Sequence, residues 1–227
     1  MMIMLAAGAL LLLSYSVIPS FGLRFWQSRR RRKKGGEKVL YLSFDDGPSE
    51  RYTGQILGLL KRYKIKAAFF VVASFAEAYP ELIKRMQEDG HMIGLHSARH
   101  QSSLLRGNKF VSSDLAQAVF AMRKLGCRAV YYRPPWGHLN LFTLLWVKKL
   151  ELKLVFWDVM AEDWEERATP ALIKKRLMKR VFPGAIICLH DGRGANGAPG
   201  NTYEALKGAI PELIARGYEF RRMDADG

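Results

Sequence analysis

Two kinds of segment alternate along most of the chain. Short apolar runs rich in β-branched and aromatic residues predict buried strands, and longer stretches with apolar positions three or four residues apart predict helices. The expected strands are Val39–Phe44, Ala67–Val72, His91–Leu95, Leu152–Trp157 and Ala185–Leu189. The expected helices are Glu50–Tyr63, Pro80–Glu88, Asp114–Leu125, Leu141–Leu150, Pro170–Arg180 and Thr202–Ala215. This alternation favours an α/β fold, with a parallel sheet closed into an incomplete barrel.

The first 23 residues differ from the rest because they contain no charged side chain and are rich in Leu, Ala and Ile. At ~1.5 Å per residue, a helix of this length can cross the ~30 Å hydrocarbon layer of a bilayer, although Pro19 and Gly22 would shorten its regular part. We therefore predict a transmembrane anchor at 1–23. A secretory signal peptide fits less well because no basic segment precedes the apolar run. No amphipathic pattern supports a buried core helix.

Basic residues follow this segment at once and define a juxtamembrane linker at 24–37. Between residues 24 and 38, eight Lys and Arg face the single acid Glu37, which puts about +7 of the formal +15 in this collar. Such a run beside a membrane helix binds anionic head groups at ~1 kcal/mol per charge. Nucleic acid fits less well as a partner because no aromatic residues are interleaved. Under the positive-inside rule, the charge favours a cytoplasmic domain at 38–227.

Two adjacent carboxylates, Asp45 and Asp46, end the first predicted strand before a Gly-Pro turn. Neighbouring acids repel each other unless a cation or a strong donor lies between them, although an Asx-capped turn would also explain this sequence. His96 and His100 follow the third predicted strand, and two imidazoles with a carboxylate can hold zinc. Two such histidines on a loop are more often solvated, so the combination with the acids carries the prediction.

Three further segments put polar side chains after apolar runs. They are R-P-P-W-G at 133–137, D-W at 163–164 and H-D at 190–191. We expect the acids, imidazoles and arginine to share one rim of the barrel, where the strands end. Residues 192–200 contain four glycines and predict a flexible loop over that rim.

In this order, the segments resemble the five motifs of the polysaccharide deacetylase family, the NodB-homology domain of carbohydrate esterase family four. The motifs are S-F-D-D-G-P at 43–48, H-S-x-x-H at 96–100, R-x-P-x-G at 133–137, D-W at 163–164 and L-H-D at 189–191. The resemblance covers roughly residues 38–220, and five ordered motifs are far more specific than one. It implies a distorted (β/α) barrel at 38–227. The implied activity is metal-dependent removal of N-acetyl groups from amino sugars of peptidoglycan or a related polysaccharide.

The resemblance also implies a role for each motif residue. Asp45 is expected to be the general base and His190 the general acid. The expected ligands of a divalent metal, with zinc as the expected ion, are Asp46, His96 and His100.

Further residues are expected to assist this chemistry. Arg133 is expected to orient the base, Asp163 to tune Arg133 and His190, and the backbone N–H of Trp136 to donate to an oxyanion. The candidate substrate-binding residues are Trp136, Pro135, Trp164 and Leu189. Aromatic faces stack on sugar rings, although the tryptophans are equally compatible with core packing.

The fourth motif departs from the family pattern. An acid is expected three residues before the Asp-Trp pair, and this chain has Met160 there. Asp163 is therefore the expected acid of the network, with Asp158 as the weaker substitute. A weaker network would change the rate or the pH optimum more than it would abolish the reaction.

Other functions stay open at this point. Two His and one carboxylate could hold iron in an oxygenase, but Asp45, Arg133 and His190 would then have no evident role in the reaction. An inactive glycan-binding module would not need both a base and an acid. A lipid-linked amino sugar at the inner membrane face is an alternative substrate, because the collar conflicts with the outward-facing domains usual in the family. Two cysteines give no disulfide framework, and no obligate protein partner is inferred.

Overall fold

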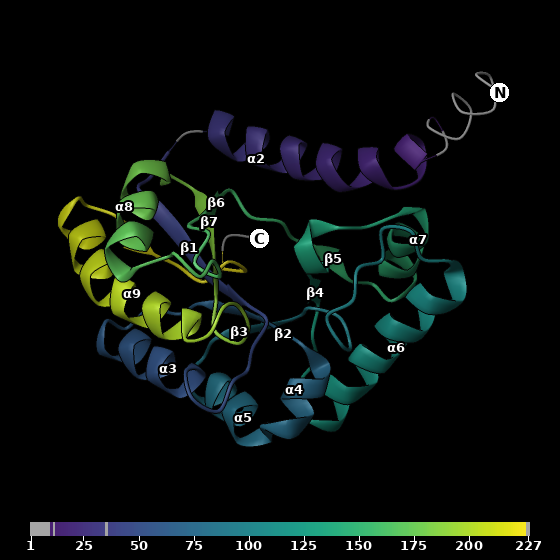
Figure 1. The fold of residues 1–227 in the computed structure, drawn as a ribbon, viewed down its shortest axis with the longest axis horizontal. Helices are drawn as coiled ribbons and strands as arrows, with labels where there is room; N and C mark the ends of the chain where they lie inside the picture. The colour runs from purple at the N-terminus through teal and green to yellow at the C-terminus, as the bar shows by residue number, and fades with distance from the viewer. Residues whose placement is uncertain (1–9, 11, 35, 226–227) are drawn as a thin grey trace.

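A computed structural model describes residues 10, 12–34 and 36–225, and it contains one curved sheet whose strand pairings are all parallel (Figure 1). The strand order is β5-β4-β3-β2-β1-β7-β6, and β8 pairs with β1. The strands are β1 Val39–Asp45, β2 Ala68–Val71, β3 Met92–Leu95, β4 Tyr131–Tyr132, β5 Lys153–Leu154, β6 Val159–Met160, β7 Ala185–His190 and β8 Glu219–Phe220. The described residues therefore form the expected α/β distorted barrel, which is incomplete.

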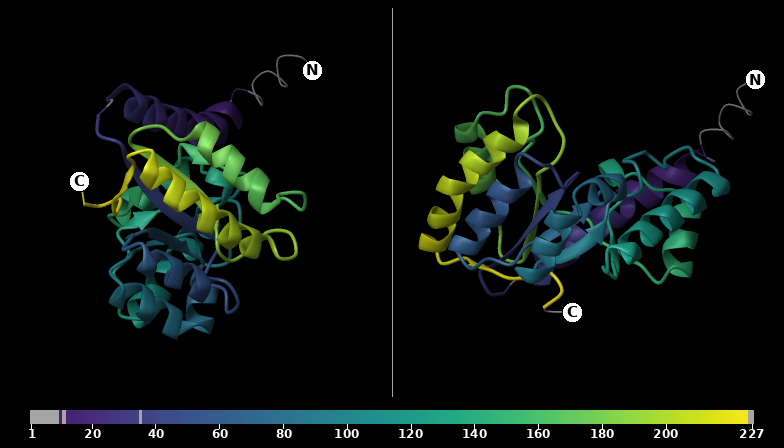
Figure 2. Two further views of the ribbon diagram at one scale, coloured as in Figure 1. Left: turned by 90° about the vertical axis from the view of Figure 1, so that its left-hand side faces the viewer. Right: turned by 90° about the horizontal axis from the view of Figure 1, so that it is seen from below.

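Helices cover the outside of the sheet (Figures 1 and 2). One flank carries α3, α8 and α9, and the other carries α4, α6 and α7. Their bounds are α3 Thr53–Arg62, α4 Ala73–Ala78, α5 Pro80–Glu88, α6 Asn108–Lys124, α7 Leu141–Lys149, α8 Pro170–Arg180 and α9 Ala198–Ala215, with a 3₁₀ turn η2 at Pro135–Gly137.

The central strand β1 separates two buried regions. Leu40, Leu42 and Phe44 alternate along it and pack into the core between sheet and helices. The residues between them face the inside of the barrel, where Tyr41 packs on the inner core and Ser43 bonds the carbonyl of the neighbouring strand. Because side chains alternate with period two, the polar residue that ends this inner row is Asp45.

The barrel is open between β5 and β6, which end the strand order and are not paired with each other in the described chain. Helix α2 (Leu23–Lys34) crosses this opening (Figure 1). The Gln27 side chain donates to Leu154 O at 3.3 Å and accepts from Phe156 N at 3.4 Å. An amide side chain thus satisfies backbone groups that no neighbouring strand pairs.

The predicted membrane anchor at 1–23 falls partly on residues 1–9 and 11, which lie outside the described residues. From Leu13 to Gly22 the chain forms a π-helix, η1, that continues into α2. In the part of the chain that the structure describes, no helix is both long and apolar enough to span a bilayer. The predicted linker is helical through Lys34 and packs on the domain, because its polar side chains find partners there.

The sequence pattern located most of the predicted strands closely, whereas the helix predicted at Asp114–Leu125 begins at Asn108. The bounds predicted for Pro80–Glu88 and Pro170–Arg180 are confirmed, and Pro at the first helical position explains both starts. The predicted strand Leu152–Trp157 is wrong beyond Leu154, because Phe156 and Trp157 leave the sheet and fill the inner core. The expected loop at 192–200 is shortened, since α9 begins at residue 198.

Candidate active site

The predicted site residues converge where the carboxyl ends of the strands meet. Asp45, the last residue of β1, is paired with His190, the last residue of β7. His96 directly follows β3, and Arg133 directly follows β4. Because all these strands run in one direction, the four side chains share one rim of the open barrel.

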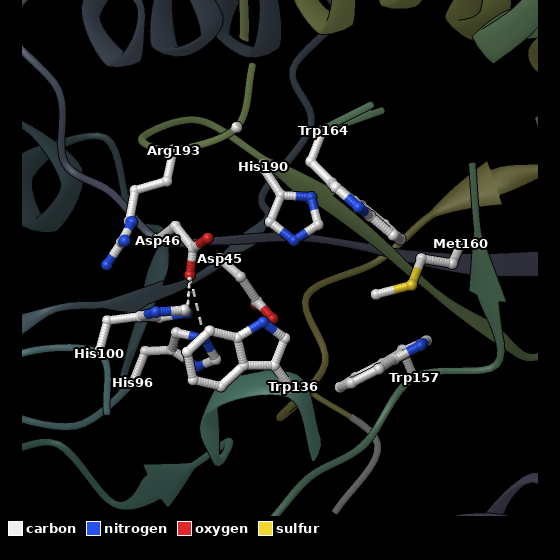
Figure 3. A pocket seen from close by; sticks show the side chains of 11 residues that line it. Asp45, Asp46, His96, His100, Trp136, Trp157, Met160, Trp164, His190 and Arg193 are labelled. Atoms are coloured by element: carbon white, nitrogen blue, oxygen red, sulfur yellow. Dashed lines mark ion pairs between the residues drawn. The ribbon is translucent and has the colours of Figure 1, made fainter. Parts of the chain in front are cut away.

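Asp46, His96 and His100 form a compact group of three buried side chains (Figure 3). Asp46 Oδ1 lies 3.1 Å from His96 Nε2 and 2.9 Å from His100 Nε2. Asp46 and His100 have φ angles of 72° and 53°, and this left-handed conformation costs a non-glycine residue ~1–2 kcal/mol. The surrounding fold holds the backbone in this conformation and aims the side chains at a common point.

The donor chemistry of this group fits a divalent cation. His96 Nδ1 lies 2.7 Å from Arg133 O, and a ring nitrogen that bonds a carbonyl must carry the proton. In the neutral ring, Nε2 is then a bare lone pair that faces a carboxylate oxygen. Two acceptors in this position repel each other unless a cation lies between them. With one carboxylate and two imidazoles, Asp46, His96 and His100 therefore form a divalent metal site.

Without a metal, the same contacts act on the carboxyl of Asp46. Burial favours its neutral form, but contacts with the His100 and His96 rings, where these are protonated, outweigh that effect and hold the pKa of Asp46 well below its ordinary value. The ligand carboxylate is therefore ionised before a cation arrives.

A buried ion pair lies beside the ligands. Arg133 Nη1 donates to Asp45 Oδ1 at 2.6 Å and to Ser43 Oγ at 2.9 Å. The guanidinium lies over the Phe70 ring at 3.9 Å, and the other carboxylate oxygen accepts from Cys188 Sγ at 3.3 Å. Breaking such a pair would leave a buried charge without a partner. Arg133 therefore holds the Asp45 carboxylate in one orientation.

One nitrogen of this pair has no partner. Arg133 Nη2 is buried and makes no hydrogen bond to any residue that the structure describes. Met160 lines the pocket at the position where the family pattern has an acid, and a thioether is only a weak acceptor. Asp158 does not replace that acid, because its Oδ2 accepts from Arg31 Nε at 2.7 Å and from Ile186 N at 2.9 Å.

His190 is fixed and charged by Asp163. The ring Nδ1 lies 2.9 Å from Asp163 Oδ1, and the His190 backbone N–H donates to Asp163 Oδ2 at 2.8 Å. Thr202 Oγ1 also donates to Asp163 Oδ2, at 2.8 Å. Burial works against the imidazolium, but the charge and hydrogen bond of Asp163 outweigh it and raise the pKa of His190 to about 9. The ring therefore carries a proton at neutral pH.

The next residue, Asp191, faces the loop before α3. Thr53 Oγ1 donates to its Oδ2 and Ser49 Oγ to its backbone carbonyl, both at 2.6 Å. Burial raises the pKa of Asp191 to about 7. These bonds fix the end of β7 to the start of α3.

A cavity of about 240 Å³ opens above the ligand group (Figure 3). The side chains of Asp45, Asp46 and His190 reach it, and the remaining lining residues are His96, His100, Trp136, Trp157, Met160, Trp164, Arg193 and Gly194. The two carboxylates, the metal-ligand group and the His190 imidazole therefore meet in one space.

Two tryptophans border this cavity from opposite sides. The Trp136 ring lies 4.3 Å from that of His100 and is 55% exposed, so it is not a core residue. The Trp164 ring lies edge-on to His190, with centroids 5.1 Å apart. An exposed aromatic face beside a polar centre suits stacking on a sugar ring.

The structure does not bring Pro135 and Leu189 to the pocket. Leu189 is fully buried in the core between sheet and helices, because it points to the opposite face of β7 from His190. Pro135 is also buried and does not line the cavity. Both are motif residues for which substrate binding is predicted, and neither lines the cavity in this structure.

Several neighbours of the reacting groups were missed by the sequence reasoning. Trp157 and Arg193 line the cavity, while Ser43 and Thr202 bond Arg133 and Asp163. Arg193 lies in the glycine-rich loop that was expected to cover the site. The position of Trp157 at the cavity could not be predicted from the sequence, because Trp157 is the last residue of an apolar run that predicts a continuous strand.

Comparisons with known proteins agree with this geometry. The family "Polysaccharide deacetylase" matches residues 32–155, more than half of the 227 residues. The peptidoglycan-N-acetylmuramic acid deacetylase PdaA of Bacillus subtilis is 33% identical over 192 residues, which cover 83% of this chain and 71% of the relative.

Solved structures are similar as well. Peptidoglycan deacetylase PdaC from Bacillus subtilis superposes with a TM-score of 0.74 at 31% identity, over 83% of this chain and 89% of the other. A family 4 acetyl xylan esterase from Clostridium thermocellum, solved with a cobalt ion, gives a TM-score of 0.74 at 30% identity, over 82% and 88%. With the motifs, the barrel and the metal-ligand group in place, the chain belongs to the polysaccharide deacetylase family of hydrolases, carbohydrate esterase family four.

Proposed function

We propose that this protein is a zinc-dependent deacetylase that hydrolyses the N-acetyl group of amino sugars in peptidoglycan or a related glycan. The observation that carries the proposal is the arrangement of three groups around one cavity. The paired base Asp45 and the charged His190 lie on neighbouring strand ends, and the metal ligands lie beside them. Zinc suits two imidazoles and one carboxylate with open positions for water and substrate.

The base side of the reaction belongs to Asp45. A bound divalent cation supplies Lewis-acid charge and lowers the pKa of water towards ~7. Asp45 would take the proton from the attacking water as the C–O bond to the acetyl carbon forms, while Arg133 keeps the carboxylate oriented. The backbone N–H of Trp136 is the proposed donor to the oxyanion of the tetrahedral intermediate, an interaction typically worth ~3 kcal/mol.

The acid side belongs to His190. Its Nδ1 is held by Asp163, so Nε2 is the atom that can give a proton to the leaving amine nitrogen. Cleavage of the C–N bond then releases acetate and a free amino sugar. A poor leaving group such as an amine requires this proton, and an imidazolium with a pKa of about 9 still holds it at neutral pH.

The proposed substrate class rests on the chemistry of the site and on the relatives' names. Trp136 offers an exposed ring beside the metal ligands, and Trp164 borders the acid, which suits a sugar held between them. Two of the proteins compared above are named as peptidoglycan deacetylases. We therefore place peptidoglycan amino sugars before other N-acetylated glycans.

Acetate release tests the proposal. The full-length protein, stripped of metal with a chelator and reloaded with zinc, should release acetate from peptidoglycan or N-acetylglucosamine oligomers, and zinc should be required. An unchanged glycan that nevertheless binds would indicate an inactive binding module. Oxygen consumption with iron would indicate an oxygenase. Activity on a lipid-linked amino sugar but not on peptidoglycan would indicate that the substrate is the lipid-linked precursor of the glycan.

The membrane side follows from the substrate in this proposal. A peptidoglycan deacetylase acts outside the cytoplasm, so a protease added to intact cells should cleave the domain that carries Asp45. Cleavage only after permeabilisation would agree with the charge of the basic collar instead. It would favour the lipid-linked amino sugar as substrate.

A further inference from the structure

The helix formed by η1 and α2 packs a polar face on the barrel. Ser20 Oγ exchanges two hydrogen bonds with the Leu139 backbone, each 2.9 Å. Gln27 bonds the backbone of Leu154 and Phe156 on the β5 side of the barrel opening. Arg31 pairs with the buried Asp158 at 2.7 Å. The surface that meets the domain is thus built largely from specific polar contacts, and Leu23 adds an apolar contact with the inner core.

The outer face of the same helix is apolar. Ile18, Phe21, Phe25 and Trp26 follow each other at helical spacing and all are exposed, Phe25 by 65% and Trp26 by 56%. A helix on a protein in water normally buries its apolar stripe and exposes its polar one. This helix does the reverse, so its outer face is suited to an apolar environment.

Basic side chains continue this outer face towards the end of α2. Arg29, Arg32 and Lys33 are exposed, and with Phe25 and Ser28 they line a hollow in the surface. Aromatic residues next to cations match the boundary of a lipid bilayer. There the rings lie at head-group level and the cations meet anionic phosphates.

We propose that the outer face of residues 18–33 lies in the plane of an anionic lipid bilayer and that the inner face fixes the catalytic domain to this surface. The contact differs from a spanning anchor with a flexible linker, because the helix lies along the membrane and is packed on the domain. A second copy of the chain fits less well as occupant. In a two-fold contact through this face, the cations of the two copies would lie close together and repel each other.

The lipid-binding face of the helix and the active site then belong to one rigid unit of the protein. Arg24, on the same helix, lies over the Trp157 ring at 4.3 Å from its centroid, and Trp157 lines the catalytic cavity. The cavity is therefore held at a fixed position relative to the bilayer, where it meets glycans near the membrane.

Flotation with vesicles tests this contact on the full-length protein. We expect binding to phosphatidylcholine vesicles that contain phosphatidylglycerol, weak binding to phosphatidylcholine alone, and loss of binding at high salt. The double substitution Phe25→Ser with Trp26→Ser should weaken binding by about tenfold or more, because both rings leave the interface. Charge reversal at Arg29 and Lys33 should weaken it similarly.

The matched control places the same change elsewhere. Phe120→Ser with Leu145→Ser alters two large apolar side chains that are also exposed, on α6 and α7, and should leave vesicle binding unchanged. Circular dichroism and zinc binding establish that each variant is folded.

Three results would overturn the proposal. The first is no flotation with anionic vesicles. The second is flotation that resists alkaline carbonate and is unaffected by the Phe25 and Trp26 substitutions, which would indicate a span formed by the preceding residues. The third is a stable dimer that the same double substitution dissociates, since a second copy would then occupy this face.

Discussion

Asp163 is the residue on which the proton of His190 depends. It accepts from both the ring and the backbone of His190 and raises the pKa of the imidazole to about 9 against the effect of burial. In the proposed mechanism His190 acts in its protonated form, so activity is expected to fall as the pH rises through this pKa.

Asp163→Asn should therefore move the alkaline limb of kcat to lower pH. Without the Asp163 carboxylate, burial is opposed only by the charges of Asp46 and Asp45, so the pKa of His190 falls from about 9. The ring also loses the partner that orients it, and kcat should fall by ~10²–10⁴ with little change in KM. A pH profile of kcat measures this, with Asp224→Asn as a control in a surface pair. An unmoved alkaline limb in the variant would contradict the role of Asp163.

The sequence predicted the reacting side chains and two of their supports, Arg133 and Asp163, but it missed the hydroxyl groups that bond those supports. Asp45, Asp46, His96 and His100 belong to fixed motifs, and the structure brings them together. Ser43 and Thr202 act only through a neighbour, which can be recognised once the strands are aligned. Leu189 shows the converse error, because adjacency to His190 in sequence places it on the opposite face of the strand.

The elements around the site depend on close contact between β1 and the segment after β7. A Cβ added at Gly192 would lie 1.9 Å from Asp46 O, so no side chain fits there without moving the backbone that carries a metal ligand. This glycine explains how two loops can approach closely enough to form the rim.

Gly192→Ala should therefore destabilise the protein by about 3 kcal/mol or more and reduce zinc affinity. Gly107→Ala is the matched control, since nothing lies within 4 Å of its added Cβ, and it should behave as the parent. Thermal unfolding and zinc titration give the two readouts. Equal stability of the two variants would show that the rim tolerates a backbone shift at Asp46.

Helix α2 is the element that closes the barrel, and Arg31 holds it to Asp158. Arg31→Ala leaves the buried Asp158 carboxylate without its ion-pair partner. It should lower the free energy of unfolding by about 2 kcal/mol, less than for a fully buried pair because Arg31 is partly exposed. For a chain of this size that corresponds to roughly 4–8 °C in Tm. Arg30→Ala, an exposed change on the same helix, should have little effect. Similar Tm values for both variants would mean that α2 is not fixed by this pair.

Element prediction succeeded where local signals are strong. Pro80 and Pro170 mark two helix starts, and the Gly-Pro turn marks the end of β1. The pattern failed for β6, a two-residue strand at Val159–Met160, because so short a run has no periodicity. The pattern also predicted a linker for residues 24–34, because a run of basic residues is typical of a solvent-exposed segment. In the structure, Gln27 and Arg31 of this segment bond the barrel.

For the whole molecule, the order of motifs along the chain predicted the architecture. Acids, imidazoles and an arginine after successive strands meet only if the sheet is parallel and curved, and both properties are found. The position of the N-terminal helix could not be predicted, because it depends on an opening between β5 and β6 that exists only once the strands have paired.

A zinc titration coupled to acetate release tests whether this site carries out metal-dependent hydrolysis. We expect activity to rise with zinc and to saturate at one ion per chain. Asp45→Asn should bind zinc equally but lose about 10³-fold or more in kcat, whereas His96→Ala should lose zinc as well. Acetate release that is independent of zinc, or is retained in Asp45→Asn, would show that this site does not carry out the hydrolysis as proposed.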